Sequence, residues 1–329
     1  MKKISLILIG LLFIPTLFLT SCDGGDDPVT GKPAFSELKI HMVGSGLDFN
    51  KIDENDEIGK FVTPAPAEAV LQTFLDEHYI IDIRSIDAWK SGHIKGAINV
   101  PFEDILEHGE LAGNKKILIV CYSGQTACYA TALMRMYGFK KTHALKWGMS
   151  GWNSTTAKSW NDNIGNIASG KLVKTEAPKD AEFKDPDLGI TIDSKEDLLK
   201  KRVKEVIKNK FKTKTAQEVL DNPSGYFINN YFKEADYLGF GHIDGAHRIL
   251  PLLLSDNSYK YLDPSKPIVT YCYTGQTSAV MTAWLNVLGY DAYSMLFGMN
   301  KLNNSNSAWA SNQWGGDSNP KNLELIVEN

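Results

Sequence analysis

Residues 121–127 read Cys-Tyr-Ser-Gly-Gln-Thr-Ala, and residues 272–278 read Cys-Tyr-Thr-Gly-Gln-Thr-Ser. Each copy follows a short apolar run, over residues 117–120 and 268–271, and each precedes a helix-like stretch. A cysteine that ends a strand and opens a short loop into a helix meets loop N–H groups and the positive end of a helix dipole. Both effects lower the pKa of a thiol, so the motif predicts a reactive thiolate at the start of each copy.

The repetition covers a whole domain. The glycine that ends the helix after the loop lies 17 positions beyond the cysteine in both copies, at Gly138 and Gly289. The segment Gly-His-Ile-Lys-Gly-Ala at 92–97 returns as Gly-His-Ile-Asp-Gly-Ala at 241–246. Strands and helices alternate in both halves, which predicts crossover connections. We therefore expect an α/β protein of two similar domains, each a central parallel sheet with helices on both faces.

The length and composition suit this organisation. The chain has 329 residues, enough for two domains, and its 43% hydrophobic and 22% charged residues are ordinary for a globular protein. We place the domains at residues 34–152 and 191–329, with a polar linker at 153–190. The net charge of −4 argues against nucleic acid as the main partner.

The first 21 residues have the pattern of a targeting segment. Two lysines precede an uncharged apolar run, which ends in Leu-Thr-Ser-Cys at residues 19–22. This ending resembles the bacterial lipobox, in which the cysteine is lipid-modified after cleavage. We expect a signal peptide over 1–21, lipidation at Cys22, a polar tether over 22–33 and a membrane-anchored location in the bacterial cell envelope. The alternative, a transmembrane anchor, is disfavoured by Pro15 and by the short apolar run.

The cysteine count does not support a disulfide framework. Of the four cysteines, three remain if Cys22 is lipidated, and three cannot all pair within the chain. Cys128 lies seven residues beyond Cys121. We interpret it as a buried small residue, and the alternative is a thiol-redox role through a disulfide with Cys121.

Two further segments have a plain and a functional interpretation. Residues 34–60 contain several acidic side chains, but their spacing does not match a calcium-binding EF-hand loop, so we expect a solvated loop. The stretch Glu196 to Phe211 is amphipathic and basic. We expect a helix packed on the second domain, and the alternative is a surface for a membrane or an anionic partner.

Together these features resemble the rhodanese family in its tandem form. The marks in the first repeat are Asp82-Ile83-Arg84, the segment at 92–97, the Cys121 loop, and Gly148 followed by Trp152. The resemblance extends over about residues 62–152 and 213–305. It implies that the two loop cysteines carry sulfane sulfur as a persulfide, without a cofactor or metal. The donor would be of thiosulfate or persulfide type, and the acceptor a thiol or cyanide.

The resemblance also assigns roles to neighbouring residues. Asp82 and Arg84 would support the first site, and a threonine hydroxyl would donate to each sulfur. The repeated histidines, His93 and His242, would form structural turns rather than act as bases. The loops that bind substrate would consist of Tyr122, Ser123, Gly124, Gln125 and Thr126 after Cys121, and of Tyr273, Thr274, Gly275, Gln276 and Thr277 after Cys272.

The chain also departs from the family pattern. Thiosulfate-using members often carry a cation directly after the cysteine, where this chain has tyrosine, so the affinity for a dianion should be reduced. The second repeat has Asn229 or Asn230 in place of Asp82, Lys233 near the position of Arg84, and no evident Trp152. We therefore expect the Cys121 site to be the better supported.

Two other classes of function remain to be weighed. Phosphatases of related fold need a longer loop that ends in arginine, and neither copy has one. The main alternative is a non-catalytic envelope module that uses this fold for binding. The presence of a cysteine in both repeats favours chemistry, because a scaffold has no need of thiols.

Overall fold

The computed structural model describes residues 34–55, 59–190, 195–316 and 318–328. The expected signal peptide, Cys22 and the tether lie outside these residues. None of the helices in the described ranges is long and apolar enough to span a membrane.

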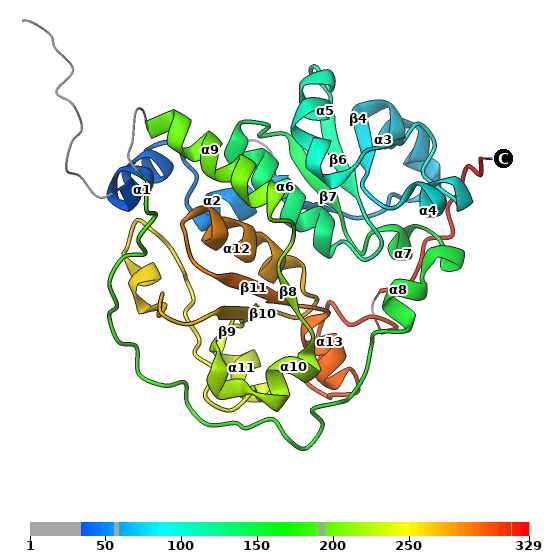
Figure 1. Cartoon of the computed structure of the whole chain (residues 1–329). Coiled ribbons are helices and arrows are strands. Elements are labelled where there is room, and N and C mark those ends of the chain that lie inside the picture. The colour runs from blue at the N-terminus through cyan, green and yellow to red at the C-terminus, as the bar shows by residue number, and fades with distance from the viewer. Residues whose placement is uncertain (1–33, 56–58, 191–194, 317, 329) are drawn as a thin grey trace, which may run out of the picture. The chain divides into compact units, whose positions relative to one another are not determined.

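The first repeat contains a five-stranded parallel sheet (Figure 1). Apolar side chains alternate between its two faces: Ile117 and Ile119 face one core, while Leu118 and Val120 face another. Helices α5 (Ile105–Leu111) and α6 (Gln125–Tyr137) cover the first face, and α3 (Leu71–Glu77) and α7 (Met149–Trp152) cover the second. The strands, in spatial order, are β3 (Val62–Thr63), β7 (Thr142–Leu145), β6 (Lys116–Val120), β4 (His78–Asp82) and β5 (Ile98–Asn99).

The second repeat has the same plan with four parallel strands. An isolated parallel bridge between Asn229 and His247 takes the place of a fifth strand. Helix α12 (Gln276–Val287) covers one face, and α10 (Ala216–Asp221), α11 (Glu234–Phe240) and α13 (Gly298–Asn303) cover the other. The strands, in spatial order, are β8 (Thr213–Lys214), β11 (Ala292–Met295), β10 (Ile268–Tyr271) and β9 (Phe227–Asn230). The expected α/β class, with two repeated parallel sheets covered on both faces, is confirmed.

The helices that follow the cysteine loops, α6 and α12, pack against each other (Figure 1). One apolar core therefore includes residues of both repeats. The remaining α-helices in the described residues are α1 (Ala34–Gly44), α2 (Phe49–Asp53), α4 (Ile86–Ser91), α8 (Lys158–Asn161) and α9 (Lys195–Lys208). A short antiparallel pair, β1 (Glu54–Asn55) and β2 (Gly59–Lys60), follows α2.

The prediction of a solvated acidic loop over residues 34–60 is wrong. This region forms α1 and α2, and Phe35, Leu38 and Met42 are buried. The carboxylate of Asp48 accepts hydrogen bonds from the backbone N–H groups of Leu254 and Ser255, at 2.8 and 2.9 Å. Asp48, which lies between the two helices, thus ties this region to the second repeat, while α2 itself contacts both α6 and α12.

Helix α9 packs differently from the expectation. It contacts α6 and α1 as well as α12, so it covers the joint between the repeats rather than the second repeat alone. Its apolar stripe, which includes Val203 and Ile207, is buried in the shared core. This burial favours the packing interpretation over a surface for a membrane.

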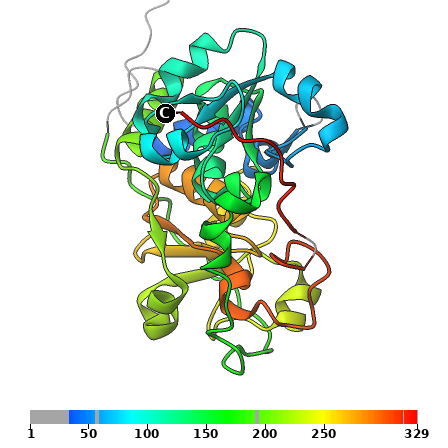
Figure 2. The same ribbon diagram turned by 90° about the vertical axis from the view of Figure 1, so that its right-hand side faces the viewer.

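Two chain segments cross between the repeats. The first crossing segment, residues 165–173, leaves the first repeat and pairs with the second: the N–H of Ala168 donates to the carbonyl of Leu302, and Val173 bridges to His242. The second crossing segment, residues 321–326, runs back to the first repeat (Figure 2). There the N–H of Leu323 donates to the carbonyl of Trp152, and Ile326 bridges to His93. The exchange is therefore reciprocal.

Candidate active site

Each cysteine directly follows an inner strand of its sheet, β6 or β10, and begins the loop that enters the buried helix. Gly124 and Gly275 form the N-caps of α6 and α12, with left-handed φ angles of 86° and 77°. A second glycine closes each loop from the neighbouring strand. A Cβ at Gly148 would lie 2.4 Å from the carbonyl oxygen of Cys121, and one at Gly298 would lie 2.0 Å from that of Cys272. Only glycine permits these approaches.

The loop N–H groups converge on the sulfur of Cys121. Its Sγ accepts hydrogen bonds from the backbone N–H groups of Gly124 at 3.1 Å and Ala127 at 3.3 Å. This arrangement resembles an oxyanion hole, because fixed donors point at a position where negative charge can develop.

The sulfur of Cys272 has a different set of partners. It accepts a hydrogen bond from the N–H of Ser278 at 3.4 Å and lies 3.8 Å from the hydroxyl of that residue. The Ser278 hydroxyl in turn hydrogen-bonds the Ser294 hydroxyl at 2.7 Å. The hydroxyl beside the sulfur is thus one position beyond the expected Thr277, whose side chain is half-buried at the rim. In the first repeat Ala127 takes this place, and Thr126 is likewise half-buried.

Burial changes the expected acidity of Cys121. The residue is only 3% exposed, and this desolvation raises the pKa of its thiol. The N–H groups of Ala127, Ser123 and Gly124 lower the pKa, while the negative charge of Asp82 raises it further. The net direction is upward, so the prediction of a lowered pKa is wrong for Cys121. Local sequence shows the donors but not the depth of burial.

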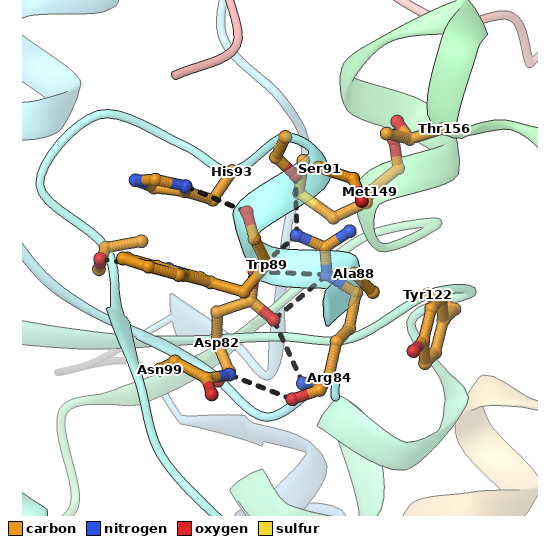
Figure 3. A network of polar contacts seen from close by, with 12 residues as sticks. Asp82, Arg84, Ala88, Trp89, Ser91, His93, Asn99, Tyr122, Met149 and Thr156 are labelled. Atoms are coloured by element: carbon orange, nitrogen blue, oxygen red, sulfur yellow. Dashed lines mark hydrogen bonds and ion pairs between the residues drawn. The ribbon is translucent and has the colours of Figure 1, made fainter. Parts of the chain in front are cut away.

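A buried ion pair supports the first loop (Figure 3). The carboxylate of Asp82 is fully buried, and the Arg84 guanidinium donates to it through Nε and Nη2 over 2.7–3.1 Å. Arg84 also donates to the carbonyl of Gly92 at 2.8 Å. Its guanidinium carbon lies 5.7 Å from the ring centroid of Tyr122, and the Tyr122 hydroxyl lies 3.0 Å from that of Ser85. The pair therefore holds the first residue after Cys121.

The second repeat replaces this ion pair by neutral groups. Strand register pairs Asp82 with Val120 and Asn230 with Tyr271, so Asn230, not Asn229, corresponds to Asp82. Two residues later, Phe232 takes the position of Arg84 and stacks on Tyr273, with ring centroids 4.2 Å apart. Lys233, expected near that position, lies one residue beyond it as the N-cap of α11. The two sites therefore differ in charge.

The two histidines are part of structural turns. The Nδ1 of His93 lies 2.9 Å from the carbonyl of Trp89, and the two rings stack. His242 stacks on Tyr237 in the same way, and its Nδ1 lies 3.4 Å from the carbonyl of that residue. Both histidines are buried beside a crossing segment. These contacts account for the repeated motif without a role in proton transfer.

The three cysteines in the described residues form no disulfide with one another. Cys121, Cys128 and Cys272 are all free and buried, so the disulfide that a redox role would require is not formed. Burial raises the pKa of Cys128 well above its ordinary value. Within the described ranges, no group of three or more His, Cys, Asp or Glu side chains could hold a metal ion.

The two loops meet across the joint between the repeats. Gln125, which we expected to bind substrate, instead accepts a hydrogen bond from the N–H of Phe297 at 2.8 Å and donates to the Ser123 hydroxyl at 3.0 Å. An aromatic cluster of Trp147, Trp160, Phe297 and Trp314 lies beside this contact. Trp160 donates to the carbonyl of Ser123 at 3.0 Å. Sequence reasoning missed Trp160, because the linker around it showed no periodic pattern.

Comparison with known proteins agrees with this architecture. The family model described as "Rhodanese-like domain" matches the chain twice, over residues 67–155 and 216–305. The chain is 33% identical over 78 residues to the putative sulfur carrier protein YrkF of Bacillus subtilis, covering 23% of this chain and 42% of that protein. It is 30% identical over 79 residues to the thiosulfate sulfurtransferase GlpE of Shewanella oneidensis, covering 24% of this chain and 78% of that one.

Similar solved structures include a thiosulfate sulfurtransferase from Pseudomonas aeruginosa. It is 14% identical, with a TM-score of 0.26, and the match covers 90% of this chain and 69% of that one. The 3-mercaptopyruvate sulfurtransferase from Leishmania major is also 14% identical, with a TM-score of 0.27 and coverage of 71% and 72%.

Proposed function

The chain belongs to the tandem rhodanese-like sulfurtransferase family, and we propose that it transfers sulfane sulfur through persulfides on Cys121 and Cys272. The observation that carries this proposal is the convergence of the Gly124 and Ala127 N–H groups on the Cys121 sulfur. Fixed donors at this position stabilise an anionic sulfur in a site that excludes water.

The reaction has two nucleophilic displacement steps, and neither step requires an oxidant. In the first, a cysteine thiolate attacks the outer sulfur of a donor such as thiosulfate; a sulfur–sulfur bond forms to the cysteine, and sulfite leaves with the electron pair of the broken bond. In the second, an acceptor thiolate or cyanide attacks the terminal sulfur of the persulfide, and the cysteine leaves as thiolate. Because the loop N–H groups face the sulfur, they can stabilise the thiolate before the first step and the persulfide anion after it.

The main alternative is a binding module without chemistry. It would retain the fold, the glycines and the buried cysteines, but no sulfur would be transferred. The two copies of the loop support the chemical function, since both place backbone N–H groups on a thiol.

Intact mass spectrometry distinguishes the two functions. The full chain with Cys22→Ser, which cannot be lipidated, is exposed to thiosulfate or to a small persulfide, alone and with Cys121→Ser or Cys272→Ser. We expect a gain of one sulfur atom at each working cysteine, lost with the matching substitution and reversed by cyanide. The absence of any gain, with both thiols shown to be reduced and titratable, would leave the binding module as the better proposal.

We also infer a lipid anchor at Cys22 and a place in the bacterial cell envelope. The support is the uncharged run with its Leu-Thr-Ser-Cys ending. Metabolic labelling with a fatty acid tests this in a bacterial host: the wild-type chain should carry the label, and Cys22→Ser should not.

A further inference from the structure

One side chain of the first repeat reaches the second cysteine loop. Gln125 is 1% exposed, and its Oε1 accepts a hydrogen bond from the backbone N–H of Phe297 at 2.8 Å. A Cβ built at Gly275, the N-cap of α12, would lie 2.1 Å from this oxygen and 2.9 Å from the Phe297 nitrogen. The Gln125 amide therefore lies against both the loop that begins at Cys272 and the turn that follows β11.

The hydrogen bonds of Gln125 fix which end of its amide faces the second loop. A backbone N–H can only donate, so the atom that faces Phe297 must be the carbonyl oxygen of the amide. At the other end, Nε2 donates to the hydroxyl of Ser123 at 3.0 Å. Since both ends of this buried amide have partners, its orientation is fixed.

The turn that receives Gln125 has a strained backbone. Phe297 has a left-handed φ of 61°, which is unfavourable for a residue with a Cβ, and Gly298 follows with a φ of 48°. Such a conformation persists only where surrounding contacts hold it. The hydrogen bond to Gln125 is made by the N–H of the strained residue itself and is buried. It is therefore placed to hold the turn.

The turn also determines the path of the second cysteine loop. The N–H of Met299 donates to the carbonyl of Cys272 at 3.0 Å, and the N–H of Asn300 donates to the carbonyl of Tyr273 at 3.2 Å. The side-chain amide of Asn300 donates to the same carbonyl at 2.8 Å. These carbonyls belong to the first two residues of the loop. The turn thus orients the loop that places the N–H of Ser278 on the sulfur.

The first cysteine loop receives no equivalent support from the second repeat. Its turn has the same conformation, with a φ of 68° at Trp147. Gln276 corresponds to Gln125, but within the described ranges no hydrogen bond joins it to Trp147, and its Nε2 has no partner. The three atoms nearest to a Cβ built at Gly124 all belong to the first repeat. The dependence therefore runs from the first repeat to the second site.

We propose that Gln125 is a positioning residue for sulfur transfer at Cys272, because a side chain of the first repeat holds the turn that orders the second loop. The inference rests on the proposed sulfur transfer and adds a residue to it. Gln125 acts through Phe297 and the turn. A second repeat without the first would lack this hydrogen bond, so its cysteine would work less well alone than in the tandem chain.

Two substitutions separate the hydrogen bond from the volume of the side chain. Gln125→Met has a similar length but cannot accept from the N–H of Phe297, whereas Gln125→Glu keeps an oxygen at that place. The matched control is Tyr129→Phe, one turn further along α6. The fully buried Tyr129 donates through its hydroxyl to the carbonyl of Lys210 at 3.3 Å, outside both loops. The control therefore also loses a hydrogen bond without touching the turn.

The rate of sulfur loading at Cys272 tests the proposal. The full chain with Cys22→Ser and Cys121→Ser is mixed with thiosulfate and followed by intact mass spectrometry. We expect Gln125→Met to lower the rate constant at saturating thiosulfate by about five- to tenfold, the effect of one lost hydrogen bond. The half-saturating concentration should change by less than about twofold, because Gln125 orders the loop rather than binds the donor. Gln125→Glu should recover most of the rate, and Tyr129→Phe should stay within about twofold of the parent.

Hydrogen exchange of backbone amides gives a second measurement that needs no sulfur. Peptides that cover residues 273–279 and 296–300 should exchange faster in Gln125→Met than in the parent, and at the parent rate in Tyr129→Phe. If Gln125→Met does not fold, Gln125→Ser takes its place, because its side chain is too short to reach Phe297.

Several results would overturn the inference. These are sulfur loading at the parent rate in Gln125→Met, no recovery in Gln125→Glu, an equal loss of rate in Tyr129→Phe, or unchanged hydrogen exchange in Gln125→Met. Failure of the sulfur-transfer function has a different signature. If the parent gains no sulfur while the exchange of the second loop depends on Gln125, the ordering of the loop stands and the sulfur-transfer function fails.

Discussion

The ion pair of Asp82 and Arg84 can be replaced by the residues that the second repeat uses at the same positions. The single change Arg84→Phe removes every hydrogen bond that the guanidinium makes to the fully buried carboxylate of Asp82. The double change Asp82→Asn with Arg84→Phe reproduces the neutral pair Asn230 and Phe232.

The structure gives different magnitudes for these variants. The Arg84 side chain is 3% exposed and that of Asp82 is 0% exposed, so Arg84→Phe leaves an uncompensated charge away from water. Such a loss costs about 3–5 kcal/mol of unfolding free energy. In the double variant the amide oxygen can still accept from the N–H of residue 84, as the carboxylate does at 3.0 Å, and the phenyl ring can stack on Tyr122. We expect the double variant to lose only about 1–2 kcal/mol.

Urea unfolding followed by tryptophan fluorescence measures these differences from the midpoint and the m-value. The cycle includes Arg84→Phe, Asp82→Asn and the double variant, and its coupling energy should be at least about 2 kcal/mol in favour of the double variant. If Arg84→Phe costs less than about 1 kcal/mol of unfolding free energy, or if the double variant is no more stable than Arg84→Phe, the ion pair does not support the loop.

Three further predictions concern the loop, the thiol and a buried histidine. Gly148→Ala should lower the unfolding free energy by about 3 kcal/mol or more, because Gly148 has a left-handed φ of 58° and a Cβ there would clash with the carbonyl oxygen of Cys121. Gly138→Ala is the control: Gly138 has a φ of 131° and open space around it, so the loss should be about 1–2 kcal/mol. Equal losses of the two variants in urea unfolding would contradict this prediction. Burial raises the pKa of the Cys121 thiol. In a Cys272→Ser variant, the rate at which iodoacetamide alkylates Cys121 should therefore rise with pH, and the midpoint of this rise should lie above the midpoint for free cysteine. A midpoint below that of free cysteine would refute the raised pKa. Burial lowers the pKa of His143 from 6.5 to about 4. The unfolded state therefore binds the proton first, and the unfolding free energy should fall as the pH falls from 6.5 toward 4. His143→Gln should make this dependence of the unfolding free energy on pH shallower, and an unchanged dependence would show that His143 does not contribute.

The sequence predicted the parts of the site that depend on local pattern. The apolar strand before each cysteine, the glycine caps and the parallel sheets all follow from periodicity and turn chemistry, and they are confirmed. Asp82 and Arg84 were predicted from the resemblance to the rhodanese family, not from the local pattern alone. The choice between Asn229 and Asn230 needed the strand register, since a shift of one residue moves a side chain to the opposite face.

Features that depend on long-range packing were not predictable in this way. The hydrogen bond from Phe297 to Gln125 exists only because α6 packs on α12, and no local pattern encodes that contact. The raised pKa of Cys121 depends on burial by distant segments. Helix α1 is different, because Phe35, Leu38 and Met42 show helical spacing in the sequence, and this signal could have predicted a buried helix there.

The reciprocal crossing segments make the molecule resistant to separation by a single cut. Residues 176–182 are mostly exposed and lie between the two pairing regions. A protease that cleaved there would leave a first fragment whose residues 165–173 still pair with the second repeat, and a second fragment whose residues 321–326 still pair with the first. Such fragments would hold each other as complementary halves, so an intact pair of cysteine sites can outlast an intact backbone.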